Sequence, residues 1–225
     1  MARMTLDGFA SRLAEALGPR LVTLLLYGSA AREPGAGSRE PDGMNTLLLV
    51  DRVDAALLEI LAAPVRDWVG AKHPAPLVLT EAEWRDSTDA FPIEYEDIRE
   101  AHRVLAGRDP WHGIRVSRED VRRQLEQELI GKLIHLRQVF AAEWGNSKRV
   151  AELMRISRAG FLTMLRATLR LAGRTPPGDG IALVREAGGL IGFPSNALDG
   201  ADPAGYLDAV TRTAEYVNRM ERNAQ

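Results

Sequence analysis

The sequence predicts an α+β fold in two parts, a mixed-sheet domain over residues 1–114 followed by an all-helical bundle domain over residues 115–225. Two short apolar runs, LVTLLLY at 21–27 and NTLLLVD at 45–51, are typical of strands that are buried on both faces. Beyond Ser117, apolar residues recur every three or four positions, which indicates helices. With 225 residues, 45% of them hydrophobic, the chain is long enough to bury a core.

The first domain is expected to alternate helices and strands. Apolar residues spaced three or four apart predict helices over 5–17 and 54–69, and PAPLVL at 74–79 predicts a third strand. The segment FPIEYEDI at 91–98 alternates apolar and polar residues, which is the two-residue period of a strand. We therefore expect a further strand here, with carboxylates along one face.

The second domain is expected to contain four helices. One apolar stripe continues from Val121 to Phe140, and a second long helix is expected over residues 148–172. The breaker GRTPPGDG then precedes two weaker helices, at about 180–190 and 203–221. Four helices suffice for a bundle.

Charge and composition narrow the class of protein. Residues 115–174 carry a net charge of +7, against −6 before them and −3 after them. We interpret this basic segment as solvated helix faces with pairs such as Arg122 and Glu126, so nucleic acid is not expected as a partner. The chain has no cysteine and no long apolar run, and its four histidines lack metal-ligand spacing. We expect a cytoplasmic protein with no membrane span and no zinc site.

The connection after the first strand carries the main functional signal. The first expected strand ends in YGSAAREPG, which contains the pair Gly28 and Ser29 and then a turn with Arg32. The second expected strand follows this segment. Glycine allows close approach of the backbone, and successive amides with a hydroxyl form a nest for phosphate. The segment resembles the opening motif of the DNA polymerase beta-like nucleotidyltransferase superfamily. This resemblance implies that Gly28, Ser29 and Arg32 bind the phosphates of a nucleotide.

Two further segments extend the resemblance. FPIEYEDIREAHRVLAGRDPW looks like the third-strand region of small bacterial members of the superfamily. The segment after it looks like the helical domain of kanamycin nucleotidyltransferase-like proteins. The third carboxylate of the family, which helps to activate the acceptor hydroxyl, matches Glu94 best.

The family's metal ligands are the weak point of the resemblance. Members carry two aspartates, at i and i+2 of the second strand, where both can hold divalent metal. When the apolar run LLLV is aligned with the apolar run of the family's second strand, the two positions fall on Met44 and Thr46. An alignment shifted by one residue puts them on Gly43 and Asn45. We prefer the first alignment, so that Met44→Asp with Thr46→Asp would restore the acids. In both alignments the metal-binding motif is degenerate, and Asp42 is the nearby acid before the strand.

Three functional hypotheses follow. The first is a pseudoenzyme of nucleotidyltransferase fold that is impaired or inactive in catalysis but binds a nucleotide or a partner. The second is a working enzyme, with Asp42 and Glu94 as catalytic acids, that moves a nucleotidyl group from an NTP to a hydroxyl. Magnesium and ATP are expected as cofactors only on this second hypothesis, and otherwise no metal or cofactor is expected. The third is an interaction protein without a nucleotide role, forming a homodimer through its helical domain.

Overall fold

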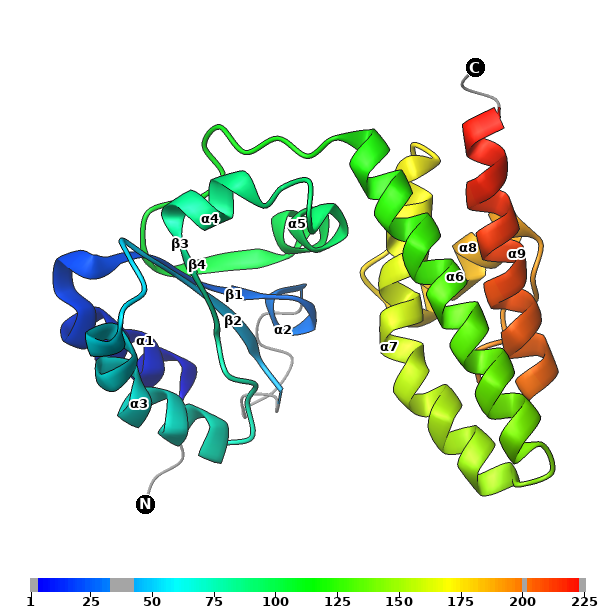
Figure 1. Ribbon diagram of the computed structural model, residues 1–225, viewed down its shortest axis with the longest axis horizontal. Coiled ribbons are helices and arrows are strands. Elements are labelled where there is room, and N and C mark those ends of the chain that lie inside the picture. Colours follow the sequence, from blue (N-terminus) through cyan, green and yellow to red (C-terminus); the bar gives the residue numbers. More distant parts are fainter. Residues whose placement is uncertain (1–3, 33–42, 200–201, 223–225) are drawn as a thin grey trace. The chain divides into compact units, whose positions relative to one another are not determined.

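The structure is a computed structural model, and it describes residues 4–32, 43–199 and 202–222. The chain divides into two compact units. The first consists of Met1–Ala90 with Glu94–Val116, and the second of Phe91–Ile93 with Ser117–Gln225. A mixed sheet lies in the first unit and helices make up the second, which confirms the predicted α+β fold class (Figure 1).

The first unit is built on a four-stranded sheet with the order β3-β2-β1-β4. β1 is antiparallel to both of its neighbours, whereas β2 and β3 are parallel. The two predicted central strands are confirmed, while the third begins three residues later than predicted. The strands are β1 (Leu21–Tyr27), β2 (Asn45–Val50), β3 (Leu77–Thr80) and β4 (His102–Gly107).

One face of the sheet is covered by α1 (Leu6–Leu17) and α3 (Ala55–Gly70), as Figure 1 shows. Their apolar stripes bury Phe9 and Trp68, whose rings stack 4.4 Å apart, against the even-numbered residues of β1 and β2. Asp54 caps α3, because its carboxylate accepts a hydrogen bond from the Leu57 amide. Both predicted helices of this unit are thereby confirmed.

The other face is covered by α4 (Glu81–Asp86) and α5 (Pro92–Glu100). Trp84, Tyr95 and Ile98 pack there against the odd-numbered residues of β1 and β2. The Tyr95 hydroxyl donates to the Trp84 carbonyl at 2.5 Å, and the two rings stack 4.1 Å apart. These contacts fix α4 and α5 to each other as well as to the sheet.

The strand predicted at 91–98 is wrong, because this segment is the helix α5. The alternating pattern ends at Tyr95, and Ile98 follows at the i+3 spacing of a helix. Both side chains are buried against the sheet, whereas Phe91 is 55% exposed. The missed strand is β4, which ends at Gly107, where φ is +81° and a Cβ would lie 2.2 Å from the Val22 carbonyl oxygen. Only glycine tolerates that contact.

The second unit is a set of long helices with caps that the sequence supplies. Ser117, Asn146 and Asp179 each accept hydrogen bonds from amides in the first turn of their helices. α6 packs on both α7 and α9, and α7 also packs on α8. All four predicted helices are confirmed, as α6 (Arg118–Glu143), α7 (Ser147–Leu171), α8 (Gly180–Ile191) and α9 (Pro203–Arg222).

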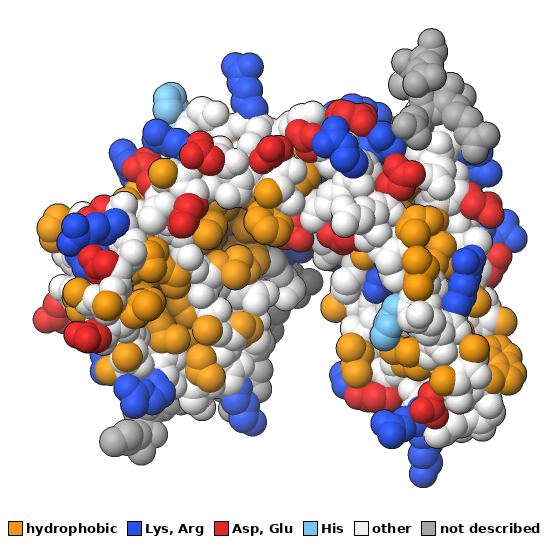
Figure 2. Space-filling model, viewed as in Figure 1, with side chains coloured by type: hydrophobic (Ala, Val, Ile, Leu, Met, Phe, Trp, Pro, Cys, Tyr) orange, Lys and Arg blue, Asp and Glu red, His pale blue; other side chains and the backbone are white. Residues whose placement is uncertain are grey.

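Hydrophobic side chains also reach the surface of this unit (Figure 2), and Ile130, Ile134 and Trp144 are exposed. Within residues 4–32, 43–199 and 202–222, the helices are too short or too polar to cross a bilayer.

Candidate functional site

The candidate site begins at the turn that follows β1. Gly28 has φ +81°, its amide donates to the Ala101 carbonyl at 3.0 Å, and its carbonyl accepts from the amides of Ala31 and Arg32. Ser29 then opens the single turn α2 (Ser29–Arg32) and is exposed. The left-handed φ favours glycine at position 28, where the strand ends, and Ser29 is exposed directly after it.

Asn45 and Tyr27 stand beside this turn on one face of the sheet. They pair directly across β1 and β2, so that their side chains project to the same side. The side-chain nitrogen Nδ2 of Asn45 lies 3.5 Å from the point that a Cβ on Gly28 would occupy. Burial raises the pKa of the Tyr27 phenol above its ordinary value, and the negative charge of Glu94 adds to that rise. Gly28, Asn45, Tyr27 and Glu94 therefore share one side of the sheet.

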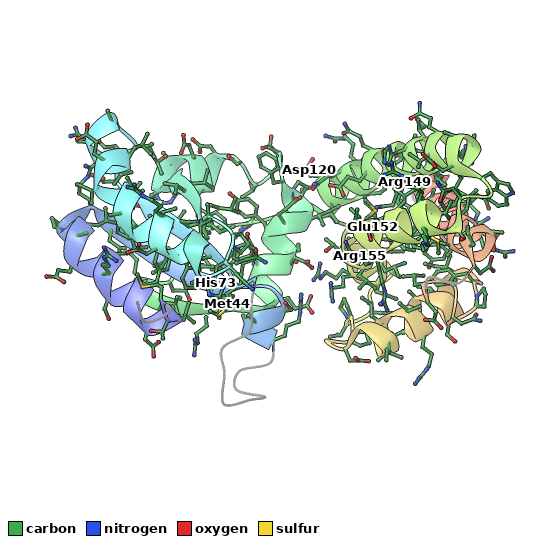
Figure 3. All side chains as sticks on the ribbon, turned by 90° about the horizontal axis from the view of Figure 1, so that it is seen from below. Met44, His73, Asp120, Arg149, Glu152 and Arg155 are labelled. Atoms are coloured by element: carbon green, nitrogen blue, oxygen red, sulfur yellow. The ribbon has the colours of Figure 1, made fainter. Side chains whose placement is uncertain are left out.

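Met44 and Thr46 do not belong to this group. Met44 is 2% exposed and packs in the core beneath α1 and α3, where its amide donates to His73 Nδ1 at 3.3 Å (Figure 3). Thr46 is 1% exposed and pairs with Leu26 of the same core. The structure does not bring either side chain to the face of Glu94, which corrects the preferred alignment.

The reason lies in the double-sided burial of β2. Because the residues of LLLV are buried on both faces, their apolar character does not reveal which residues face which side. Of the two alignments, the one-residue shift is the one that includes a residue, Asn45, paired with Tyr27 beside the turn.

Arg32 is engaged by α5 rather than presented to solvent. Its Nη2 lies 3.8 Å from Asp97 Oδ1 and 4.0 Å from Glu100 Oε1, and the side chain is 12% exposed. Its Nε and Nη2 atoms are buried and make no hydrogen bond to the described part of the chain. These charges tie the turn to the end of α5, so a phosphate group would have to compete with two carboxylates for this guanidinium.

Both ring nitrogens of His102 lie at hydrogen-bond distance from other groups of the first unit. Its Nε2 accepts from the indole N–H of Trp111 at 3.0 Å, so Nδ1 carries the proton, which faces the carbonyls of Ile98 and Arg99 at 3.0 Å each. Both ring nitrogens are thus occupied by structural contacts. This arrangement supports a packing role for His102 rather than proton transfer.

The described residues do not fit a magnesium site at this turn. Glu94, Asp97 and Glu100 all lie on α5, and Asp97 and Glu100 both contact Arg32. No group of three Asp, Glu or His side chains in residues 4–32, 43–199 and 202–222 is placed to hold a metal. Asn45 offers only a neutral amide oxygen, whereas magnesium prefers carboxylates and phosphates in octahedral geometry. Asp42 lies outside the described residues.

Several arginines of the helical unit form ion pairs along their own helices. Arg122 contacts Glu119 at 2.8 Å and Glu126 at 2.9 Å, and Arg155 contacts Glu152 at 2.7 Å on α7 (Figure 3). The predicted i,i+4 pair of Arg122 and Glu126 is therefore confirmed. Pairing of this kind offsets part of the positive charge of the basic segment.

Comparison with models of protein families and with curated proteins finds no match to this chain. Among solved structures, the chain is similar to a crystal structure of a spectinomycin adenyltransferase from Enterococcus with ATP and spectinomycin. The two sequences are 12% identical and the TM-score is 0.41, over 94% of this chain and 96% of the other.

Proposed function

We propose that this protein is a nucleotidyltransferase-like pseudoenzyme that binds a nucleotide at the turn after β1 and does not transfer its nucleotidyl group. The proposal rests on Asn45, a half-buried amide beside Gly28, at a position where the resemblance to the nucleotidyltransferase superfamily, with the one-residue shift, would put a metal-binding carboxylate. A bound metal neutralises charge on the phosphoryl group and lowers the barrier by several kcal/mol. Without ligands for that metal, turnover is expected to be very slow or absent.

The same residue supports binding without catalysis. An amide carries no charge and donates two hydrogen bonds, so Asn45 can approach a phosphate oxygen without the repulsion that an aspartate would cause. The open hydroxyl of Ser29 adds another donor to that turn. Together, the Asn45 amide and the Ser29 hydroxyl favour the binding of a nucleotide that carries no magnesium.

The test is calorimetric titration of ATP with EDTA and with magnesium, alongside an assay for pyrophosphate release. We expect ATP to bind equally in both conditions and no pyrophosphate to form. Asn45→Asp should weaken metal-free binding by about tenfold, because it removes donors and adds repulsion. Asp51→Asn is the matched control, since Asp51 follows β2 at the other end of the strand and its loss should leave ATP binding unchanged.

Two results would overturn the proposal in different ways. Pyrophosphate release by the wild-type protein, abolished by Asp42→Asn, would show a working enzyme that uses Asp42. Failure of ATP to bind in either condition would instead favour an interaction protein without a nucleotide role.

A further inference from the structure

A half-buried amine lies in the helical unit, where α6 packs on α7. Lys132 belongs to α6, and its Nζ donates to the Ser157 carbonyl at 3.2 Å and to the Ser157 hydroxyl oxygen at 2.9 Å, both on α7. The Tyr206 hydroxyl of α9 donates to the same hydroxyl oxygen at 3.0 Å. Tyr206 is 1% exposed, so Ser157 is fixed from its buried side while it holds the amine.

Lysine is a rare choice in this chain. Of its 29 Lys and Arg residues, three are lysines, Lys72, Lys132 and Lys148. Lys72 and Lys148 are exposed, whereas Lys132 is half-buried. A guanidinium keeps its proton in proteins, whereas a lysine amine gives up its proton readily when it is buried. Burial therefore distinguishes Lys132 from the other two lysines as a source of neutral amine.

The contacts of Lys132 favour that neutral form. Burial lowers the pKa of the Lys132 amine, and the negative charge of Glu128, one turn earlier on α6, opposes this change. A neutral amine has two N–H donors, which match the two Ser157 oxygens, and a lone pair that these contacts do not use. Among the residues that the structure describes, no carboxylate lies at ion-pair distance from Nζ, so the ammonium form gains no partner there.

The amine borders open surface at Gly160. This glycine of α7 is exposed, and the point that its Cβ would occupy lies 3.7 Å from Lys132 Nζ. Glycine in a helix interior costs about 1 kcal/mol relative to alanine, but here it leaves the space of a methyl group beside the amine. A small electrophile can reach Nζ through that space.

The charge around the amine favours an anionic reagent. Residues 115–174, which include both Lys132 and Ser157, carry a net charge of +7. Arg158 is exposed, and it lies close enough to Tyr206 for its positive charge to act on the phenol. Such charges raise the local concentration of small anions.

We propose that Lys132 is an acylation site whose donor is a small acyl phosphate. The neutral amine attacks the carbonyl carbon, the new N–C bond forms, and the C–O bond to phosphate breaks, with its electron pair leaving on the phosphate. The nitrogen then loses one proton to water. The amide that results keeps a single N–H, so one of the two hydrogen bonds to Ser157 is lost. The site is separate from the turn at Gly28, and it does not depend on nucleotide binding there.

The test is acetylation of the full chain with acetyl phosphate at neutral pH, followed by mass spectrometry that quantifies each lysine. Lys72 and Lys148 are internal controls, because all three amines meet the same reagent. We expect Lys132 to react at least about tenfold faster than either, since a larger fraction of its amine is neutral. In concentrated urea the three rates should converge, because unfolding removes the burial.

Ser157→Asp separates a neutral amine from one that is merely accessible. A carboxylate at this position gives the ammonium form an ion-pair partner, so acetylation of Lys132 should slow by about tenfold. Ser11→Asp is the matched control, because it makes the same change at an exposed position of α1 and should leave the rate unchanged. Circular dichroism reports whether both variants fold. If Ser157→Asp does not fold, the comparison of native and urea-treated wild type decides.

Three outcomes would overturn the proposal. The first is a Lys132 rate no higher than those of Lys72 and Lys148 in the folded chain. The second is a faster Lys132 rate that persists in urea, which would indicate an effect of the neighbouring sequence rather than of the fold. The third is equal Lys132 rates in folded Ser157→Asp and Ser11→Asp.

Discussion

Thr46→Asp tests the corrected register of β2 most directly. Thr46 is 1% exposed, among apolar side chains beneath α1 and α3. A carboxyl buried in such a place has its pKa raised by about 3–5 units, so at pH 7 the folded state holds it largely neutral. Each of the ~3 units between the ordinary Asp pKa of about 3.9 and pH 7 is worth 1.36 kcal/mol, which gives a penalty of about 4 kcal/mol. Since a whole domain is stable by only ~5–15 kcal/mol, the first unit should lose a large part of its stability.

Asn45→Asp is the matched control, one residue away on the opposite face. Asn45 is half-buried beside the exposed end of the turn, so its replacement should change the free energy of unfolding by less than about 1 kcal/mol. Urea unfolding at pH 7, followed by circular dichroism and tryptophan fluorescence, measures both variants.

The pH dependence of Thr46→Asp provides a second readout. The introduced carboxyl has a higher pKa in the folded state than in the unfolded state, so the penalty is full above the raised value and shrinks as the pH falls. It vanishes below about 3.9, where the group is protonated in both states. Urea unfolding at pH 5 should therefore show a smaller difference from wild type than at pH 7.

A Thr46→Asp variant as stable as Asn45→Asp would refute the assignment of Thr46 to the buried face, and the first alignment would stand. If the assignment holds, Met44→Asp with Thr46→Asp cannot restore a metal site, because both carboxylates would enter the core.

Two further predictions concern buried hydroxyl groups. The Thr46 hydroxyl makes no hydrogen bond to the described residues, so Thr46→Val should raise the free energy of unfolding by about 1 kcal/mol. Thr23→Val should lower it by about 1 kcal/mol, because it removes the hydrogen bond to the Arg108 carbonyl. Urea unfolding in which both substitutions change the free energy in the same direction would contradict this prediction. Burial raises the pKa of Tyr95 to about 12, so ultraviolet titration of Tyr95→Phe should lack the highest tyrosine transition. Because the folded state favours the neutral phenol, wild type should lose stability relative to Tyr95→Phe as the pH rises from about 10 to 12.

The sequence alone was sufficient to predict a helix or a strand where one hydrophobic periodicity dominated the segment. β1 and β2 stood out as apolar runs too short for core helices, and the stripe from Val121 to Phe140 could only be buried by a helix. The helical pattern was predicted to begin beyond Ser117, and the structure places a cap there, because the side-chain oxygen satisfies amides that the helix leaves unpaired. The turn at Gly28 was also visible, since glycine between two apolar runs implies a tight reversal.

Periodicity failed in the segment from Phe91 to Gly107. Three alternating apolar residues satisfied a strand pattern, yet the same residues fit a short helix whose Tyr95 and Ile98 meet the sheet. The choice between helix and strand depended on Trp84, which stacks on Tyr95. Trp84 lies outside the segment whose pattern was read. A local pattern does not contain that contact, so β4 and α5 were assigned only in three dimensions.

The kinds of residue available near the turn can be read from the sequence: Gly28, Ser29, Arg32, the run that begins near Met44, and the acids of α5. Which of these residues meet depends on the packing of the strands and helices. Cross-strand pairing set Asn45 beside Gly28 and turned Thr46 into the core, and the packing of α5 brought Asp97 and Glu100 to Arg32. The physical reason is that a strand buried on both faces has no polar side to mark its register, whereas its hydrogen-bonded neighbours fix that register residue by residue.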